Sequence, residues 1–308
     1  MHIDRRTGLA AALLAALFVP ATAHVASFDC ARAASATEKR ICADPQLSHD
    51  DEAVAAAYAR ALAAAPLPFV VRDDQRNWIA EVRDKAPGNA DLHSGLVSRA
   101  AALTAQAADD IATASPVALA TIAAHCTAPR TDAGTCKVEA AGRLPAAHLA
   151  WQRRAYSDGD TSTAAGIVVY AVEGAIARPI VWHDEDDAAF EDPALIASPA
   201  GTLLDLGGYL HGTGNFSAEV VLLQEAGAWR QLDTGAIDTG LVAHVPRGRA
   251  IWKGIYPDWR HMTVDSPLWK TTDGNCCPTG GTVRATLKRV GLRILVDRAV
   301  YDPRPLAE

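Results

Sequence analysis

The sequence of 308 residues has no excess of positive charge. Aspartate and glutamate outnumber lysine and arginine by 36 to 29, which gives a net charge of −7. Proteins that bind nucleic acids neutralise phosphates with clustered basic side chains, so this balance argues against nucleic-acid binding. With 49% hydrophobic and 21% charged residues, the composition is that of a folded protein and not of a disordered one.

Long apolar runs are also missing. The run Leu9–Val19 has 11 residues, whereas a membrane-spanning helix needs about 20. It follows Arg5 and Arg6 and precedes Ala21-Thr22-Ala23, which is the charged, apolar and small-residue order of a signal peptide. We expect cleavage after Ala23, a periplasmic or secreted location, and no membrane span in the mature chain. Without residues 1–23 the chain has 27 basic and 35 acidic residues, a net charge of −8.

No two cysteines have the two-residue separation of a zinc knuckle or a thioredoxin site. An even number of cysteines in an exported chain favours disulfides. A bond between the neighbours Cys276 and Cys277 would close a strained ring, so we expect at least one of them to pair with Cys126 or Cys136. The six cysteines that follow the signal peptide are Cys30, Cys42, Cys126, Cys136, Cys276 and Cys277.

Hydrophobic periodicity divides the chain near residues 114–116. Residues 24–114 are rich in alanine and predict a small, disulfide-stabilised four-helix module. Ser35 and Glu38 form a capping-box pattern at the start of one helix, and Asp44-Pro45 is a typical start of the next. Two more helices are expected over about 72–86 and 90–112. The apolar side of the first is Trp78, Ile79 and Val82, and the larger apolar residues of the second include Leu92, Leu96, Leu103 and Ile111.

Residues 115–308 predict a mainly antiparallel β domain, so the fold class is α+β with two domains. The last two expected strands, 282–290 and 292–301, meet at Gly291 as a hairpin, and a short helix is expected around 236–244. The other expected strands are 136–144, 148–156, 166–172, 176–182, 202–210, 218–224 and 229–233.

The N-terminal part carries a recognisable motif. Its residues are Phe28-Asp29-Cys30, Glu38, Ile41-Cys42, Asp44-Pro45, Leu47, Asp51, Tyr58 and the stretch from Asp74 to Asp84 with Gln75 and Trp78. Over about residues 28–105 the chain resembles the lysozyme inhibitor LprI-like N-terminal domain family of exported bacterial proteins. The resemblance implies a disulfide between Cys30 and Cys42 and inhibition of lysozyme. Two positions depart from the family pattern: Asp50 replaces an apolar residue, and no cysteine follows Trp78.

The resemblance and the acidic charge together indicate a partner. Lysozymes are commonly basic, and an acidic protein is steered toward them by long-range attraction. We therefore expect an exported, non-enzymatic binding protein whose partner is a lysozyme or another cell-wall enzyme. The alternatives are a cell-envelope glycan- or peptide-binding module and an unrecognised periplasmic hydrolase.

The second half has the unusual segments. The aromatic loop Trp252–His261 is the best candidate for recognition, and six of the seven tryptophans lie in this half. The glycine-rich segment Gly207–Asn215 predicts tight turns, and its His211 is a candidate for a ligand cleft. The acidic run His183–Asp187 is expected to be a solvated loop, not a metal site.

Motifs of known catalytic sites are missing. The sequence has no nucleophile elbow, no Ser-x-x-Lys arrangement of penicillin-recognising enzymes and no His-Glu-x-x-His zinc helix. We expect no catalytic residue, no metal and no cofactor, whereas a hydrolase would use His211 or His261. The binding candidates are His211, Trp252, Tyr256, Trp259 and His261.

Overall fold

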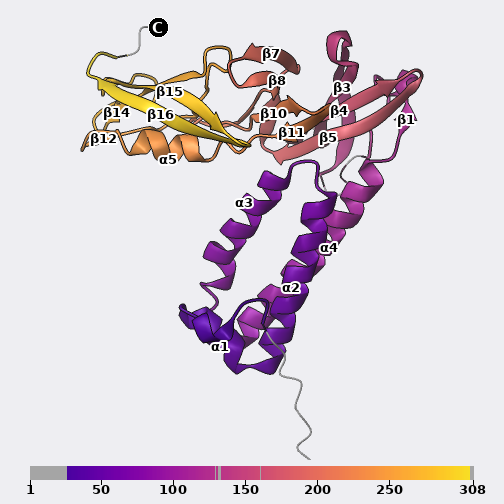
Figure 1. Cartoon of the computed structure of the whole chain (residues 1–308), viewed down its shortest axis with the longest axis vertical. Helices are drawn as coiled ribbons and strands as arrows, with labels where there is room; N and C mark the ends of the chain where they lie inside the picture. Colours follow the sequence, from indigo (N-terminus) through magenta and orange to yellow (C-terminus); the bar gives the residue numbers. More distant parts are fainter. Residues whose placement is uncertain (1–25, 129, 131–132, 160, 306–308) are drawn as a thin grey trace, which may run out of the picture.

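The computed structural model describes residues 26–128, 130, 133–159 and 161–305, so the expected signal peptide lies outside the described residues. The chain folds into an N-terminal helical part and a mainly antiparallel β part, which confirms the α+β layout (Figure 1). Across the described ranges, no helix has the length and apolar character needed to cross a membrane.

Local sequence signals account for the starts of the first two helices. The Ser35 hydroxyl accepts a hydrogen bond from the Glu38 N–H at 3.0 Å, and the Glu38 carboxylate accepts one from the Ser35 N–H at 2.9 Å. Asp44 caps the next helix, which begins with Pro45. Both expected starts are confirmed. The α-helices of this part are α1 Ala36–Ala43, α2 Pro45–Ala64, α3 Pro68–Trp78 and α4 Asn89–Thr113.

The third helix differs from its prediction. It begins at Pro68, earlier than residue 72, because a proline at the first helical position needs no N–H partner. After Trp78 it continues as a π-helical turn, Ile79–Arg83. The wider turn rotates the residues that follow, and Val82, expected on the apolar side, is 46% exposed. Ile111, one of the larger apolar residues of α4, is 67% exposed.

The helical part has its own core between α2 and α4. Ala57 and Ala61 are fully buried there and let the helices approach closely, while Leu96 and Leu103 of α4 fill the remaining space. The Cys30–Cys42 disulfide joins the short segment before α1 to the C-terminal end of α1. Asp50 is buried on α2, and its carboxylate lies 2.6 Å from Nδ1 of His93 on α4.

The β part begins with a five-stranded antiparallel sheet in the order β1-β5-β4-β3-β2. Its strands are β1 Val117–Ala118, β2 Thr135–Leu144, β3 Leu149–Asp158, β4 Thr161–Glu173 and β5 Ile176–Asp186. The acidic run His183–Asp187, expected to be a loop, is mostly the end of β5. Asp184 there holds both Nε and Nη2 of the buried Arg154, at 2.9 and 2.7 Å, which explains why an acidic residue ends a buried strand.

A four-stranded sheet in the order β11-β10-β8-β7 forms the centre of the β part. Side chains alternate between the faces of a strand, so Leu204 and Leu222 pack toward the five-stranded sheet while Leu203 and Val221 pack the other way. The strands are β7 Ala194–Ser198, β8 Gly201–Leu206, β10 Val220–Glu225 and β11 Ala228–Gln231.

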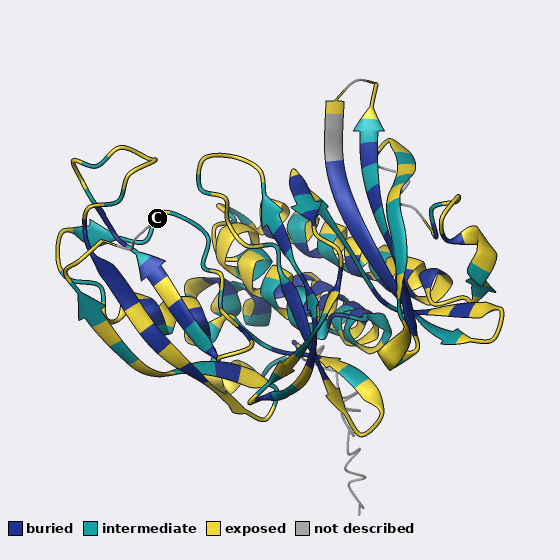
Figure 2. Ribbon diagram, turned by 90° about the horizontal axis from the view of Figure 1, so that it is seen from above, coloured by how far each residue is buried: buried dark blue, intermediate teal, exposed yellow. Residues whose placement is uncertain are grey.

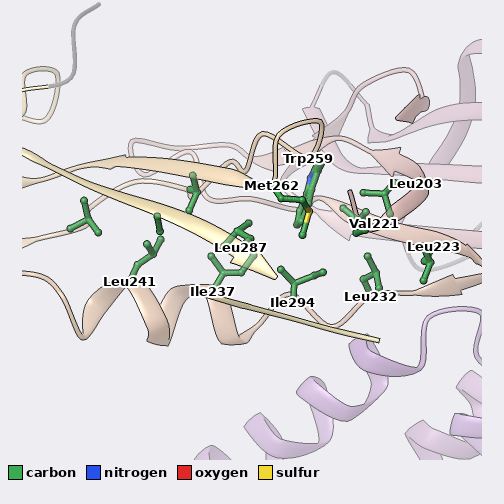
Figure 3. Close-up of a cluster of buried hydrophobic side chains, with 14 of the residues drawn as sticks. Leu203, Val221, Leu223, Leu232, Ile237, Leu241, Trp259, Met262, Leu287 and Ile294 are labelled. Atoms are coloured by element: carbon green, nitrogen blue, oxygen red, sulfur yellow. The ribbon is translucent and has the colours of Figure 1, made fainter. Parts of the chain in front are cut away.

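The second face of the central sheet is covered by the C-terminal elements (Figure 3). The hairpin β15 Thr282–Val290 and β16 Arg293–Asp302 forms a three-stranded sheet with β13 Thr263–Pro267, and α5 Ala236–Val242 packs on β16. Both the hairpin and α5 confirm the prediction. Figure 2 shows buried and exposed residues alternating along these strands, as in β15. Two short strand pairs complete the part: β6 Ala188–Phe190 with β9 Gly208–Leu210, and β12 Arg249–Ala250 with β14 Trp269–Lys270.

The helical part is joined to the sheets at the upper ends of α3 and α4 (Figure 1). Leu67, which precedes α3, is 3% exposed and belongs to the core between the two large sheets. The Phe69 N–H donates to Oε1 of Gln231 at 2.8 Å, and Trp182 Nε1 donates to Oδ1 of Asp110 at 2.8 Å. Apolar burial and hydrogen bonds therefore hold the two parts together.

The pairing expected for the last four cysteines was wrong. Cys126 bonds to Cys136, and Cys276 bonds to its neighbour Cys277. The amide of Gln152 on β3 donates to the His125 carbonyl at 2.8 Å and so holds the residue before Cys126 against β3. The Cys276 turn follows β14, which lies at the other end of the β part from β1 (Figure 1). The two ends of the β part are too far apart for Cys276 or Cys277 to bond to Cys126 or Cys136.

Candidate functional site

Three segments that are far apart in the sequence meet at one end of the central sheet. The Gly254 N–H donates to the Gly214 carbonyl at 3.0 Å, and the Tyr256 hydroxyl donates to the Asn215 carbonyl at 2.5 Å. The Asn275 side chain donates to the Thr213 carbonyl at 3.2 Å. The glycine-rich segment, the aromatic loop and the turn with the adjacent cysteines thus form one cluster of loops.

Glycine permits this close approach. A Cβ atom on Gly254 would lie 2.2 Å from the Asn215 carbonyl oxygen, and one on Gly214 would lie 2.3 Å from the Phe216 ring. Both distances are far below van der Waals contact, so a side chain at Gly254 would push the two loops apart, and one at Gly214 would displace the Phe216 ring.

Three aromatic side chains are exposed on this cluster, and we call Phe216, Trp252 and Tyr256 the aromatic shelf. Their exposed fractions are 55%, 36% and 44%. Trp252 stacks on the buried Trp269 with ring centroids 6.2 Å apart and planes inclined by 17°. The shelf therefore rests on the packed interior.

Beside the shelf stand two acidic side chains, Asp205 and Glu219, which we call the carboxyl pair. Asp205 lies opposite Val221 in the register of β8 and β10, and Glu219 precedes Val221 by two positions. The two-residue period of a strand puts both on the face of Leu203 and Val221. Trp259 is only 2% exposed and donates its Nε1 hydrogen to Oε1 of Glu219 at 2.9 Å.

The carboxyl pair holds a proton at neutral pH. Burial, followed by the neighbouring Asp205 charge, raises the pKa of Glu219 to about 8, although the Trp259 hydrogen bond opposes this. Burial also raises the pKa of Asp205 to about 6, against the hydrogen bond from Glu219. Two carboxylates in contact cannot both ionise without a large electrostatic cost. We conclude that Glu219 is protonated and donates to Asp205.

A third carboxyl group, Glu191, lies close to this pair. Its N–H donates to the Gly207 carbonyl at 2.8 Å, and its Oε2 lies 3.2 Å from the position of a Cβ on Gly207. Its negative charge contributes to the raised pKa of Asp205 and Glu219. The end of the sheet thus combines exposed rings with polar groups that accept and donate hydrogen bonds.

A large cleft opens on the other side of Glu219, between the helical part and the sheets. Its volume is about 1250 Å³, and its walls come from α3, α4, β5 and the ends of β10 and β11. The acidic side chains that line it are Asp73, Asp74, Asp109, Asp110, Asp184, Glu185, Glu219 and Asp233. We call it the acidic cleft.

The charge of the acidic cleft is only partly compensated. Its two arginines, Arg130 and Arg154, pair with Asp186 and Asp184 at 2.8 and 2.7 Å. Burial raises the pKa of Asp110, while the hydrogen bond from Trp182 lowers it. Burial, with the Asp233 charge, also raises the pKa of Asp73 against the attraction of Arg76. Arg76, Arg99 and Arg293 pair with three more of the lining acids. The remaining negative charge lies mainly on Asp109, Asp110 and Glu185, and the walls of the cleft focus its field.

The predicted binding residues occupy different positions. Trp252 and Tyr256 lie on the aromatic shelf, whereas the ring of Trp259 is buried in the core beside Met262 (Figure 3). The stacking on a ligand expected for Trp259 is therefore excluded. His261 is exposed, and its Nδ1 lies 2.7 Å from Asp258, while Nδ1 of His211 lies 3.4 Å from Asp187.

Sequence reasoning missed Glu191, Asp205 and Glu219. Asp205 and Glu219 are each a single acidic residue in or beside a buried strand, whereas Glu191 follows β6 and is adjacent to Asp192. A lone acid at a core-facing position of an apolar strand is a usable signal, because burying an unpaired charge is costly. Among the described residues, no group of three or more histidine, cysteine or acidic side chains is arranged to hold a metal ion.

Comparison with known proteins adds no assignment. The sequence matches no known family profile, and no curated protein matches it either.

Proposed function

We propose that this chain is an exported binding protein that takes a basic segment of a lysozyme or another cell-wall enzyme into the acidic cleft. The observation that carries the proposal is the cleft itself, which is lined by eight acidic residues. Arginines pair with four of them, and Glu219 keeps its proton, so the negative charge offered to a partner lies mainly on Asp109, Asp110 and Glu185. The three disulfides are typical of an extracytoplasmic protein, which is where such a partner acts.

The size of the cleft favours a protein segment over a small molecule. Small-molecule pockets measure about 300–1,000 Å³, and this cleft, at about 1250 Å³, is larger and open to solvent. A loop with lysine and arginine side chains would fill it and meet carboxylates on both walls. Charge complementarity of this kind accelerates association and selects basic partners.

The resemblance of residues 28–105 to lysozyme inhibitors supports the same partner. The helical part supplies one wall of the cleft through α3 and α4, and the sheets supply the other. We therefore expect the complete mature chain to bind, because neither part alone has both walls. We propose binding without turnover, with no cofactor.

Removal of exposed cleft charges tests this proposal. Asp109 and Glu185 lie on opposite walls, and replacing both by Asn and Gln keeps the side-chain shapes. We expect the double variant to bind a basic lysozyme about tenfold more weakly than wild type, because it loses two attractive charges. Inhibition would be followed by the turbidity of a bacterial suspension and affinity by calorimetry.

A matched control is Glu52→Gln, which removes a charge from an exposed position of α2 outside the cleft. It should bind like wild type. The proposal is abandoned if the mature protein neither binds nor inhibits any lysozyme type at low salt, or if the control weakens binding as much as the cleft variant.

A further inference from the structure

The aromatic shelf is an exposed apolar surface with no role in the acidic cleft. Large side chains exposed singly are common on proteins, whereas a group of them marks a binding surface. Phe216, Trp252 and Tyr256 come from two segments that the Gly254–Gly214 and Tyr256–Asn215 hydrogen bonds hold together. The fold thus brings together aromatic residues from two distant parts of the sequence.

The rings of the shelf are held in place before any ligand arrives. Trp252 is stacked on Trp269, and the Tyr256 hydroxyl is fixed on a backbone carbonyl. A surface that is already ordered loses little conformational entropy on binding. Flat, rigid and partly exposed rings suit a ligand with a flat apolar face.

Hydrogen-bonding groups lie next to the rings. Burial, followed by the charges of Glu219 and Glu191, raises the pKa of the Tyr256 phenol, so the electrostatic field of both carboxyl groups reaches the shelf. Glu191 can accept a hydrogen bond, and the Asn275 amide, which donates to the Thr213 carbonyl, stands at the edge of the loop cluster. Apolar faces beside fixed donors and acceptors are what a sugar ring requires, because it has apolar C–H faces and a rim of hydroxyl groups.

The charges at the shelf define the kind of sugar. Glu191 and the carboxyl pair repel an acidic sugar. The Lys253 ammonium lies 6.0 Å from the centroid of Trp269, on which Trp252 stacks, so charges of both signs stand near the rings. We propose that the aromatic shelf binds a neutral oligosaccharide, with sugar rings stacked on Tyr256 and Trp252 and hydroxyl groups bonded to Glu191.

Calorimetric titration of the mature protein with defined oligosaccharides tests the inference. The probes are neutral hexamers of glucose and of N-acetylglucosamine and an oligogalacturonate. We expect a neutral hexamer to bind and the oligogalacturonate to bind at least about tenfold more weakly, since one charge repelled at short range costs more than 1.4 kcal/mol. Equal or better binding of the oligogalacturonate overturns the assignment of a neutral ligand.

Variants locate the site. Tyr256→Ala and Trp252→Ala should each weaken the neutral complex about tenfold, because each removes a stacking face, whereas Tyr256→Phe keeps the face and should stay within about threefold of wild type. Phe69→Ala is the matched control, since it removes an aromatic ring from the acidic cleft and should leave saccharide binding unchanged. Circular dichroism checks that each variant is folded. The inference is wrong if no neutral probe binds, or if both shelf variants bind it as wild type does.

Discussion

The acidic cleft and the aromatic shelf lie on either side of Glu219 and differ in almost every physical respect. The cleft is lined by eight acidic side chains and is formed where helices meet sheets. The shelf presents three aromatic rings and is formed by loops of the β part alone. Charge acts over several ångströms and is weakened by salt, whereas stacking requires contact. One chain thus offers a long-range and a short-range recognition surface.

The two surfaces also rest on different supports. One wall of the cleft is held by the buried ion pair of Arg154 and Asp184, and Arg154 is only 1% exposed. The shelf is held by close backbone approach at Gly214 and Gly254 and by the stack on Trp269. Disturbing one support should therefore leave the other surface intact.

The largest expected effect comes from Arg154→Met. The variant leaves Asp184 and the Thr127 carbonyl without their buried donor, and breaking a buried ion pair on one side costs about 3–5 kcal/mol of unfolding free energy. Denaturant unfolding measures the loss. Under conditions where the variant is folded, binding of a basic partner should weaken and saccharide binding should persist.

Two comparisons make this result specific. Adding Asp184→Asn should recover part of the stability, because no uncompensated charge then remains. Lys288→Met breaks the 2.8 Å pair with Asp297, whose partners are 51% and 41% exposed, and should cost less than about 1 kcal/mol. If Arg154→Met and Lys288→Met lower the free energy of unfolding equally, the buried ion pair contributes no more to stability than the exposed one.

The same contrast explains what the sequence could predict. The capping box at Ser35, the start at Asp44-Pro45 and the final hairpin follow from residues within a few positions of each other, and all three are found. The exposure of Val82 depends on a π-helical turn that hydrophobic periodicity does not contain. Local sequence patterns therefore predict where helices and strands begin better than they predict which of their side chains are buried.

The candidate site depends on contacts between distant residues. Asp205 and Glu219 meet only because β8 and β10 pair in one register, and Tyr256 meets Asn215 across 41 positions. The sequence singled out the aromatic loop, the glycine-rich segment and the cysteine turn separately, but it contains no information about their convergence. The bond between Cys276 and Cys277 was missed for the same reason, since its alternative required knowing how far away Cys126 lies.

A smaller effect is expected from Glu219→Gln. In the unfolded chain this group releases its proton around its ordinary pKa of 4.5, whereas in the folded protein it keeps the proton up to about pH 8. The unfolded state therefore binds fewer protons between these values, and the free energy of unfolding falls as pH rises from 4.5 to 8. Glutamine resembles the protonated form, so the variant should gain on the order of 2 kcal/mol over wild type between pH 5 and pH 8.

Denaturant unfolding at several pH values tests this sign. Glu225→Gln is the control, because this residue ends the same strand, β10, in an exposed position, and it should follow the wild-type pH profile. A Glu219→Gln profile parallel to that of wild type would mean that Glu219 titrates normally and that the carboxyl pair does not share a proton.

The smallest effect, and the most direct test of the comparison, is the response of the two surfaces to salt. The Debye length falls from about 30 Å at 0.01 M salt to about 10 Å at 0.1 M. A basic partner attracted by the acidic cleft should lose about tenfold in affinity over this range, mostly through slower association. An uncharged oligosaccharide on the shelf has no charge to screen, so its affinity should change less than about twofold. Calorimetry of both ligands in the same buffers provides the measurement. If both affinities fall together, the carboxylates around Glu219 dominate both surfaces, and the distinction between the cleft and the shelf is only one of shape.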